Sequence, residues 1–142
     1  MSSYLNFYVR KNDTFVLLDN FSRNSIIYSK FNGAPWEKIA EVNSNMIDNV
    51  QKLIHLEVKE CEKAIKKLKK KIKLLSATNE TIKEKCDWID EFNEDIVDYK
   101  NEIKWEKAAI RFLDFIKRVG ENEGNTIYYG CECWEPTVDD VV

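Results

Sequence analysis

Few side chains in this sequence are arranged for catalysis. His55 is its one histidine, and it lies between two apolar residues inside a helical pattern. An imidazole in such a place is packed or solvated far more often than it is catalytic. The chain has four glycines, none in a phosphate-binding loop, and no serine or cysteine in a nucleophile motif. We therefore expect a protein that is not an enzyme and that has no cofactor.

Cys131 and Cys133 have the one spacing in the chain that suggests a metal. A structural zinc ion takes four ligands, usually with two or more residues between paired cysteines, and a single residue separates these two. We expect no metal and place both thiols on one face of a buried strand, with zinc as the alternative. Cys61 and Cys86 fall in helical seams and are expected to behave as small apolar residues.

Arginine and tyrosine side chains near the N-terminus could bind an anion. In a strand over the first ten residues, Tyr8 and Arg10 share the outer face. Arginine binds phosphate through charge-assisted hydrogen bonds and stacks on aromatic rings. The alternative is that these groups only decorate a half-exposed sheet. The predicted anion or nucleotide site, at an oligomer interface, consists of Tyr8, Arg10, Arg23, Tyr28 and Arg111.

A row of aromatic residues marks a second candidate surface. Trp88, Phe92 and Tyr99 follow one another at helical spacing, about 80–100° round the helix from its apolar seam. Large aromatic side chains in an exposed row are typical of interfaces. We expect this row to contact a partner or a second copy of the chain, and packing against the sheet or the other helix is the alternative.

Two blocks of opposite charge flank one short turn. Residues 59–73 hold eight lysines and two glutamates, a net charge of +6, and residues 80–98 hold eight carboxylates and two lysines, a net charge of −6. A turn at Ser76–Asn79 would place the blocks side by side, with paired residue numbers adding to about 155. We expect these charges to pair within the hairpin and to fix its register, although each exposed pair contributes only about 0–1 kcal/mol.

The lysine block has two further interpretations, nucleic-acid binding and contact with an acidic partner. Residues 59–75 contain no aromatic side chain on which a base could stack. Eighteen lysines against four arginines also disfavour base reading by bidentate contacts. We therefore consider binding of nucleic acid the weakest of the functional alternatives.

Hydrophobic periodicity predicts an α+β fold in a single domain over 1–142. Alternating apolar residues predict antiparallel strands within 4–31, including a third strand over 25–30, and residues 32–43 read as a connector with a short turn at Pro35 and Trp36. Three-and-four spacing predicts a long antiparallel helical hairpin over 44–119, its helices covering 44–75 and 79–119.

The C-terminal quarter is predicted to return to the sheet. The second helix becomes apolar on all sides after residue 108, so its end should pack on the sheet, and Gly120 should terminate it. Residues 125–134 read as a last strand of the same sheet. Residues 135–142 carry four carboxylates and read as a loose acidic tail.

Composition places the chain among folded proteins away from membranes. The hydrophobic content is 44% and the net charge only −3. There is no apolar run of the roughly 18 residues that a membrane span needs, and no secretory signal pattern. A cytoplasmic location with reduced thiols is expected.

Abundant lysine, asparagine and isoleucine, small size and a strand–hairpin–strand layout resemble phage or prophage accessory proteins of low-GC Gram-positive bacteria. The resemblance covers the whole chain without a specific motif. It implies a non-enzymatic, self-associating protein in a bacterial host cell that blocks or sequesters a defence component. The alternative that it implies is a sponge for a small nucleotide immune signal at an oligomer interface.

Overall fold

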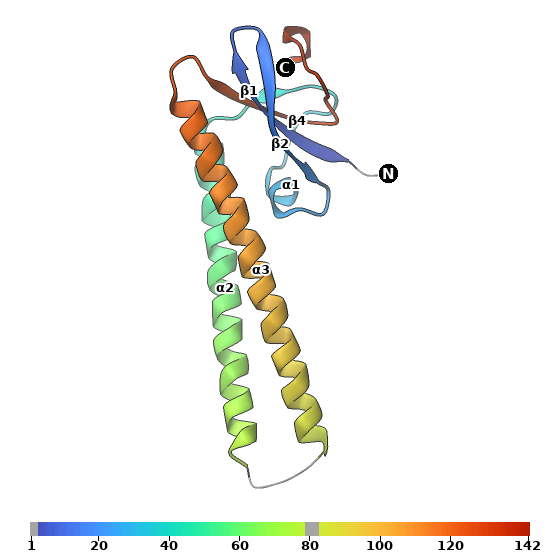
Figure 1. Ribbon diagram of the computed structural model, residues 1–142, viewed down its shortest axis with the longest axis vertical. Coiled ribbons are helices and arrows are strands. Elements are labelled where there is room, and N and C mark those ends of the chain that lie inside the picture. The colour runs from blue at the N-terminus through green and yellow to red at the C-terminus, as the bar shows by residue number, and fades with distance from the viewer. Residues whose placement is uncertain (1–2, 79–82) are drawn as a thin grey trace. The chain divides into compact units, whose positions relative to one another are not determined.

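The computed structural model describes residues 3–78 and 83–142 (Figure 1). Two long helices run antiparallel, α2 (Ser44–Ser76) and α3 (Lys83–Glu121), and a four-stranded antiparallel sheet includes a C-terminal strand. The predicted α+β fold class is therefore confirmed. The end of α2 lies one residue from the predicted position, whereas the predicted start of the second helix at Asn79 lies outside the described residues.

The chain forms two compact units within the one domain that the sequence predicts. The first unit is Met1–Leu53 with Ala109–Val142, and it contains the sheet. The second unit is Ile54–Ala108, and it contains the helical hairpin. The chain passes between the units inside α2 and inside α3. Among the described helices, none is long and apolar enough to cross a bilayer.

The C-terminal strand lies inside the sheet. Strands β1 (Tyr4–Lys11), β2 (Thr14–Ser22), β3 (Ala40–Glu41) and β4 (Thr126–Cys131) are arranged in the order β2-β1-β4-β3. Both neighbours of β1 are antiparallel to it, and the β1–β2 turn contains Asn12 at φ 59°. Asparagine adopts this left-handed conformation more readily than most residues, which suits a tight turn between the two strands.

The prediction of a third strand over 25–30 is wrong. Residues Ile26–Lys30 form the short helix α1, and Ser25 caps it by accepting a hydrogen bond from the Tyr28 backbone N–H at 3.2 Å. Ile27 and Phe31 are both buried. Residues four apart lie on the same face of a helix. In a strand every second residue shares a face, so a strand does not specifically predict that residues four apart are buried together. The serine cap therefore decides the local structure.

The predicted connector supplies the missing edge strand. β3 pairs with β4, and Trp36 forms an isolated bridge to Cys131 in place of the expected helical turn. The Cys131 N–H donates to the Pro35 carbonyl at 2.8 Å, and the Glu37 N–H donates to the Cys131 carbonyl at 2.8 Å. These bonds hold residues 35–41 against the sheet.

One face of the sheet packs on the end of α3. Phe7, fully buried at the centre of β1, contacts the rings of Phe31, Phe112 and Tyr129 with centroid distances of 5.2, 5.3 and 6.2 Å. Phe112 belongs to α3, so the expectation that the apolar end of this helix packs on the sheet is correct. The helix continues through Gly120 to Glu121, two residues beyond the predicted end at residue 119.

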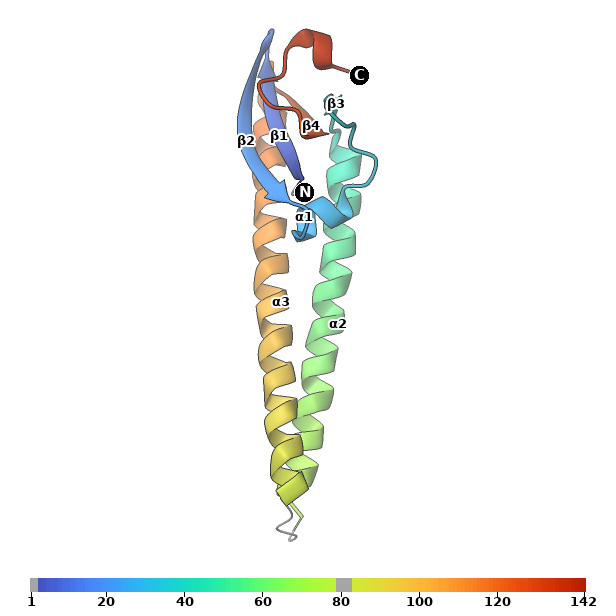
Figure 2. The same cartoon turned by 90° about the vertical axis from the view of Figure 1, so that its right-hand side faces the viewer.

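The C-terminal segment covers the opposite face of the sheet, so the expectation of a loose tail is wrong. Its residues Val138–Asp140 form a short 3-10 helix, and Figure 2 shows the segment beside β3 and β4. The Ile39 N–H donates to the Asp140 carbonyl at 3.0 Å, and the Val142 N–H donates to the Ile39 carbonyl at 2.8 Å. Tyr8, Ile39, Tyr128 and Cys133 form a buried apolar cluster beneath it.

Gly130 is required by this close packing. A Cβ atom at this position would lie 1.9 Å from the Lys38 carbonyl oxygen, which belongs to the backbone and cannot turn away. We expect Gly130→Ala to lower the free energy of unfolding by about 3 kcal/mol or more, the upper end of typical overpacking costs. Chemical denaturation followed by circular dichroism measures this change.

Gly124→Ala is the matched control for that substitution. Gly124 has φ +80°, and a Cβ there would meet nothing within 4 Å, so the cost should be only the roughly 1–2 kcal/mol of a left-handed backbone. Equal losses in the two variants would contradict the packing explanation.

Candidate functional site

The helical hairpin pairs in a register different from the expected one. The Lys71 ammonium lies 5.6 Å from the centre of the Phe92 ring, and Glu57 lies beside Glu106. Each pair of residue numbers adds to 163, not to the predicted value of about 155. The difference of eight residues corresponds to about two helical turns. The apolar seam sets this register. Among the described residues of this unit beyond Ile54, the buried apolar side chains are Val58, Cys61, Ile65 and Ile96.

The two charge blocks do not pair with each other as predicted. In the part of the hairpin that the structure describes, no lysine of residues 59–73 forms an ion pair with a carboxylate of residues 84–98. The lysine side chains of the block are exposed. The charges therefore do not fix the register of the hairpin. The hairpin therefore has one basic helix and one acidic helix.

The predicted aromatic row lies along α3 within the hairpin unit. Trp88 is 54% exposed and Tyr99 38% exposed, while Phe92 is half-buried under Lys71. The row continues at spacings of four, three, four, three and four residues through Trp88, Phe92, Asp95, Tyr99, Glu102 and Glu106. This spacing keeps one side of a helix in line over several turns. We call this line the aromatic stripe.

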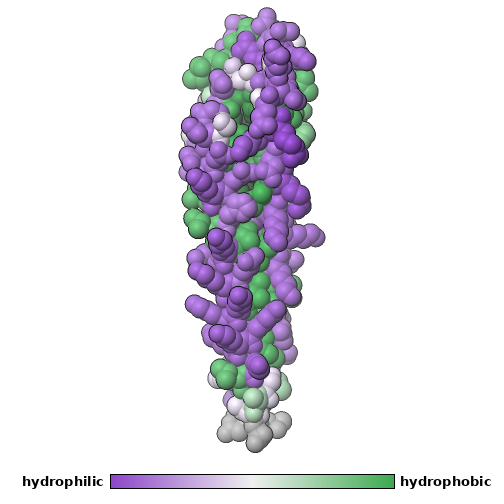
Figure 3. Space-filling model, turned by 90° about the vertical axis from the view of Figure 1, so that its left-hand side faces the viewer, coloured by the Kyte–Doolittle hydropathy of each residue, from purple (hydrophilic) through white to green (hydrophobic). Residues whose placement is uncertain are grey.

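Apolar and small residues of α2 lie level with the aromatic stripe. In the observed register, Leu75 is level with Trp88, Leu68 with Asp95, and Ala64 with Tyr99. Figure 3 shows an apolar band along the hairpin with hydrophilic side chains on both sides of it. The hairpin therefore presents exposed apolar surface of the kind that usually contacts a partner.

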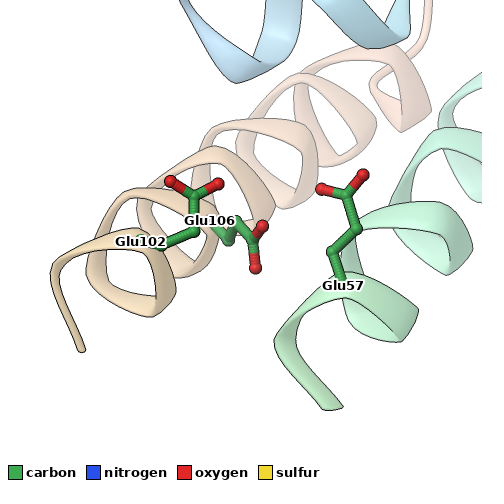
Figure 4. A group of neighbouring side chains, drawn as sticks. All are labelled: Glu57, Glu102 and Glu106. Carbon is green, nitrogen blue, oxygen red and sulfur yellow. The ribbon is translucent and has the colours of Figure 1, made fainter. Parts of the chain in front are cut away.

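Three glutamates meet inside the hairpin. Glu57 projects from α2, and Glu102 and Glu106 project from successive turns of α3 (Figure 4). One carboxylate oxygen from each residue lies within 4.8 Å of the other two. We call this group the carboxylate cluster. It is the one group of three or more potential metal ligands among the residues described.

Glu106 is the buried member of the carboxylate cluster. Its side chain is 1% exposed, and its Oε2 atom has no hydrogen-bond partner among the described residues. Burial raises the pKa of Glu106 to about 8, and hydrogen bonds and charge repulsion from Glu57 and Glu102 add to the shift. Near neutral pH the carboxyl group of Glu106 is therefore mostly protonated when it has no other partner.

The sequence interpretation overlooked this cluster. It assigned the acidic block of α3 to pairing with the lysine block and gave Glu57 no role. The available signal was a glutamate on the inner side of one helix combined with two glutamates four residues apart on the other. Only the corrected register shows that these three positions are level with one another.

The predicted anion site lies in the sheet unit, where Tyr8 is part of the core. Its side chain is 3% exposed, and its hydroxyl donates to the Cys133 carbonyl. Burial, with a smaller contribution from Cys133, raises the pKa of Tyr8 to about 12. The outer face of β1 is thus covered by the C-terminal segment and is not half-exposed at this position.

Arg10 is held by groups of its own sheet. Its Nε donates to the Asn12 carbonyl at 2.7 Å and its Nη1 to the Tyr128 hydroxyl at 3.2 Å. Its Nη2 lies 3.5 Å from an Asp13 oxygen, and the guanidinium lies 5.3 Å from the centre of the Phe15 ring. An anion would have to compete with these four partners.

The other three residues of the predicted anion site lie on separate elements. Arg23 is exposed after β2, Tyr28 lies on α1 and shares a 3.0 Å hydrogen bond with the Ser3 hydroxyl, and Arg111 is exposed on α3. Among the described residues, no hydrogen bond or common partner joins the three arginines. The structure therefore does not bring the five residues together as one pocket.

Cys131 and Cys133 do not share one face of a strand as expected. β4 ends at Cys131, and Glu132 has φ 52°, so Cys133 turns into the cluster with Tyr8. Both thiols are buried, and burial raises the pKa of each. A raised pKa disfavours the thiolate that binds zinc. In the described part of the chain neither thiol belongs to a group of three potential ligands.

A cleft of about 460 Å³ lies in the sheet unit, between the start of α2, the end of α3 and β4. Its charged lining consists of Glu41, Asp48, Lys117 and Glu121. The Lys117 ammonium lies 2.6 Å from Asp48, which neutralises the one cation there. The cleft is therefore acidic and unsuited to a phosphorylated ligand.

The comparisons with known proteins give no relative. No family model, no curated protein and no solved structure matches this chain.

The buried carboxyl group predicts how stability depends on pH. The ordinary pKa of a glutamate side chain is 4.5, and the pKa of Glu106 in the folded protein is about 8. Between these values the folded state holds one proton more than the unfolded state. The free energy of unfolding therefore falls as pH rises, by up to about 1.4 kcal/mol per pH unit from this group.

Glu106→Gln removes this loss, because an amide cannot ionise. We expect the variant to melt within a few degrees of the parent at pH 5 and at a clearly higher temperature at pH 9. Thermal unfolding of both proteins measures the difference, and Glu94→Gln, at an exposed position of the same helix, is the control. A constant difference from pH 5 to pH 9 would contradict the assignment.

Proposed function

We propose that this protein is a non-enzymatic binding protein that self-associates through its helical hairpin. The observation that carries the proposal is the pair of charge blocks on adjacent helices that leave each other unpaired in the described hairpin. A second copy offers the complementary pattern, since its acidic helix can lie beside the basic helix of the first. The aromatic stripe supplies the apolar surface between them.

A two-fold axis parallel to the helices gives this arrangement. Such an axis places α2 of one copy beside α3 of the other, with both hairpin turns at the same end. In the observed register, lysines 66–73 then lie level with residues 90–97 of the partner copy. The same contact occurs twice, as in other two-fold dimers. The result is a four-helix bundle, in which residues of facing helices fill a common core.

The size of the hairpin fits a stable dimer. Residues Ile54–Ser76 of α2 span roughly 35 Å, and two helices side by side are roughly 20 Å wide. One face of this size covers roughly 700 Å², close to the roughly 800 Å² that each partner contributes to a standard interface.

The aromatic and charged residues would contribute differently. Trp88 and Tyr99 are residues of the types that dominate binding energy when they become buried. Exposed lysine–carboxylate pairs contribute little affinity but select the orientation of the partner, since a copy turned end for end would place lysine beside lysine. The stripe would therefore hold the dimer together and the charges would choose its geometry.

Contact with nucleic acid through the lysine block is the competing use of the same surface. The lysines are exposed, but the acidic helix beside them would repel a phosphate backbone. We therefore favour a protein as the partner. The dimer would be the form of the chain that blocks or sequesters this partner. Inhibition of a bacterial defence component, as the phage-type resemblance implies, stays a prediction about that partner.

Charge exchange tests the dimer. One variant carries Lys63→Glu, Lys67→Glu and Lys70→Glu, which brings the net charge of residues 59–73 from +6 to 0. The other carries Glu84→Lys, Glu91→Lys and Asp98→Lys, which brings the net charge of residues 80–98 from −6 to 0. We expect each variant alone to be monomeric in light scattering, because neither of the two equal contacts of its two-fold dimer then joins oppositely charged blocks, whereas one contact of a mixed dimer still does. An equimolar mixture should form a heterodimer.

This mixture distinguishes the dimer from charge pairing inside one hairpin. Mixing cannot restore a contact within a chain, so only an interface between copies predicts recovery. Glutamate and lysine have similar helix propensities, and circular dichroism checks that both variants are folded. A monomeric parent protein, or variants that remain dimeric alone, would overturn the proposal.

Two tryptophans on the same helix test which side of the hairpin is used. Trp88 and Trp105 are 54% and 60% exposed, and they lie about 100° apart round α3. We expect Trp88→Ala to weaken the dimer at least 30-fold in sedimentation equilibrium and Trp105→Ala to change it less than threefold. The reverse order would place the interface on the other side of α3.

A further inference from the structure

The carboxylate cluster has the features of an ion site, and two of its members lie at the end of the line that carries the aromatic residues of the proposed interface. A group of acidic residues alone would not indicate a ligand, because exposed carboxylates gather on many surfaces. Here the central member, Glu106, is 1% exposed, and its Oε2 atom has no hydrogen-bond partner among the residues described. Figure 4 shows the Glu106 carboxylate between those of Glu102 and Glu57.

The spacing of the oxygens suits a single cation. Mg²⁺ binds oxygen at 2.0–2.1 Å and Ca²⁺ at 2.3–2.6 Å, so two oxygens on opposite sides of one ion lie roughly 4–5 Å apart. The three carboxylates of the cluster offer oxygens that all lie within 4.8 Å of one another. One ion can therefore reach all three without a change in the helix backbone.

The chemistry of the ligands selects the class of ion. All three donors are carboxylate oxygens, which suit hard cations such as Mg²⁺, Ca²⁺ and Mn²⁺. No histidine or cysteine belongs to the group, so copper and zinc, which prefer nitrogen and sulfur, are less suitable. Water molecules would complete the coordination, as is usual for Mg²⁺ in proteins.

We propose that Glu57, Glu102 and Glu106 bind one hard divalent cation inside the helical hairpin. The ion would accept the unpartnered Glu106 oxygen as a ligand and join α2 to α3 near the Ile54 and Ala108 ends of the hairpin unit. Because its ligands come from both helices, the ion would fix the register that the apolar seam has already selected. The site would therefore be structural or regulatory.

Manganese is the probe of choice, because free Mn²⁺ gives an electron paramagnetic resonance signal that disappears on binding. We expect titration of the full chain to show one bound Mn²⁺ per chain, displaced by Ca²⁺ or Mg²⁺. Glu57→Gln and Glu102→Gln should each weaken binding at least tenfold. Both positions are half-buried, so both variants should stay folded, as is expected of Glu106→Gln.

Two exposed glutamates of the same helices serve as matched controls, Glu62 on α2 and Glu94 on α3. Glu62→Gln and Glu94→Gln should change the affinity for Mn²⁺ less than twofold, which separates the cluster from general attraction to the acidic helix. The proposal is overturned if millimolar Mn²⁺ leaves the signal unchanged. Equal effects of cluster and control variants would overturn it as well.

Discussion

The apolar seam between α2 and α3 determines what the hairpin can do. Val58, Cys61, Ile65 and Ile96 are buried there, and their burial fixes which residues of the two helices are level with one another. A buried aliphatic side chain contributes roughly 1.5–3 kcal/mol, whereas an exposed ion pair contributes about 0–1 kcal/mol. The seam therefore sets the register, and the positions of the charged residues follow from that register. In that register the three glutamates meet and the charge blocks remain unpaired.

A second constraint acts on the sheet, where β1 and β4 are covered on both faces. Phe7 faces α3, while Tyr8 faces the cluster beneath the C-terminal segment. This double cover explains why Tyr8 and Arg10 have partners within the protein. It also explains Gly130, since the backbone of Lys38 approaches too closely for any side chain. Packing therefore organises the sheet unit. The aromatic stripe and the two charge blocks belong to the hairpin.

The sequence predicted features that depend on local periodicity and missed those that depend on a distant partner. The long helices, strands β1, β2 and β4 and the packing of Phe112 on the sheet follow from the spacing of apolar residues. The helix that begins at Ile26 could have been predicted from the sequence, because serine, here Ser25, is a common N-cap residue. The register of the hairpin could not be predicted in this way, since the charge pattern suggested a register eight residues away from the one that the seam gives. Without the register, Glu57 could not be matched to Glu106, and the carboxylate cluster stayed invisible.

Two unfavourable features remain in a single copy of the chain, the unpaired surface charges and the buried Glu106 oxygen. They bear on function in different ways. Unpaired lysines and carboxylates on the hairpin surface cost little, because water solvates them, so they indicate a preference in orientation more than a need for a partner. The buried Glu106 oxygen is different, because water does not reach it and a polar group left unpaired in the interior is destabilising. Natural sequences usually keep such a conflict where it serves a site. The carboxylate cluster is therefore the more specific sign of selection in this chain, and the charged surface is the more general one.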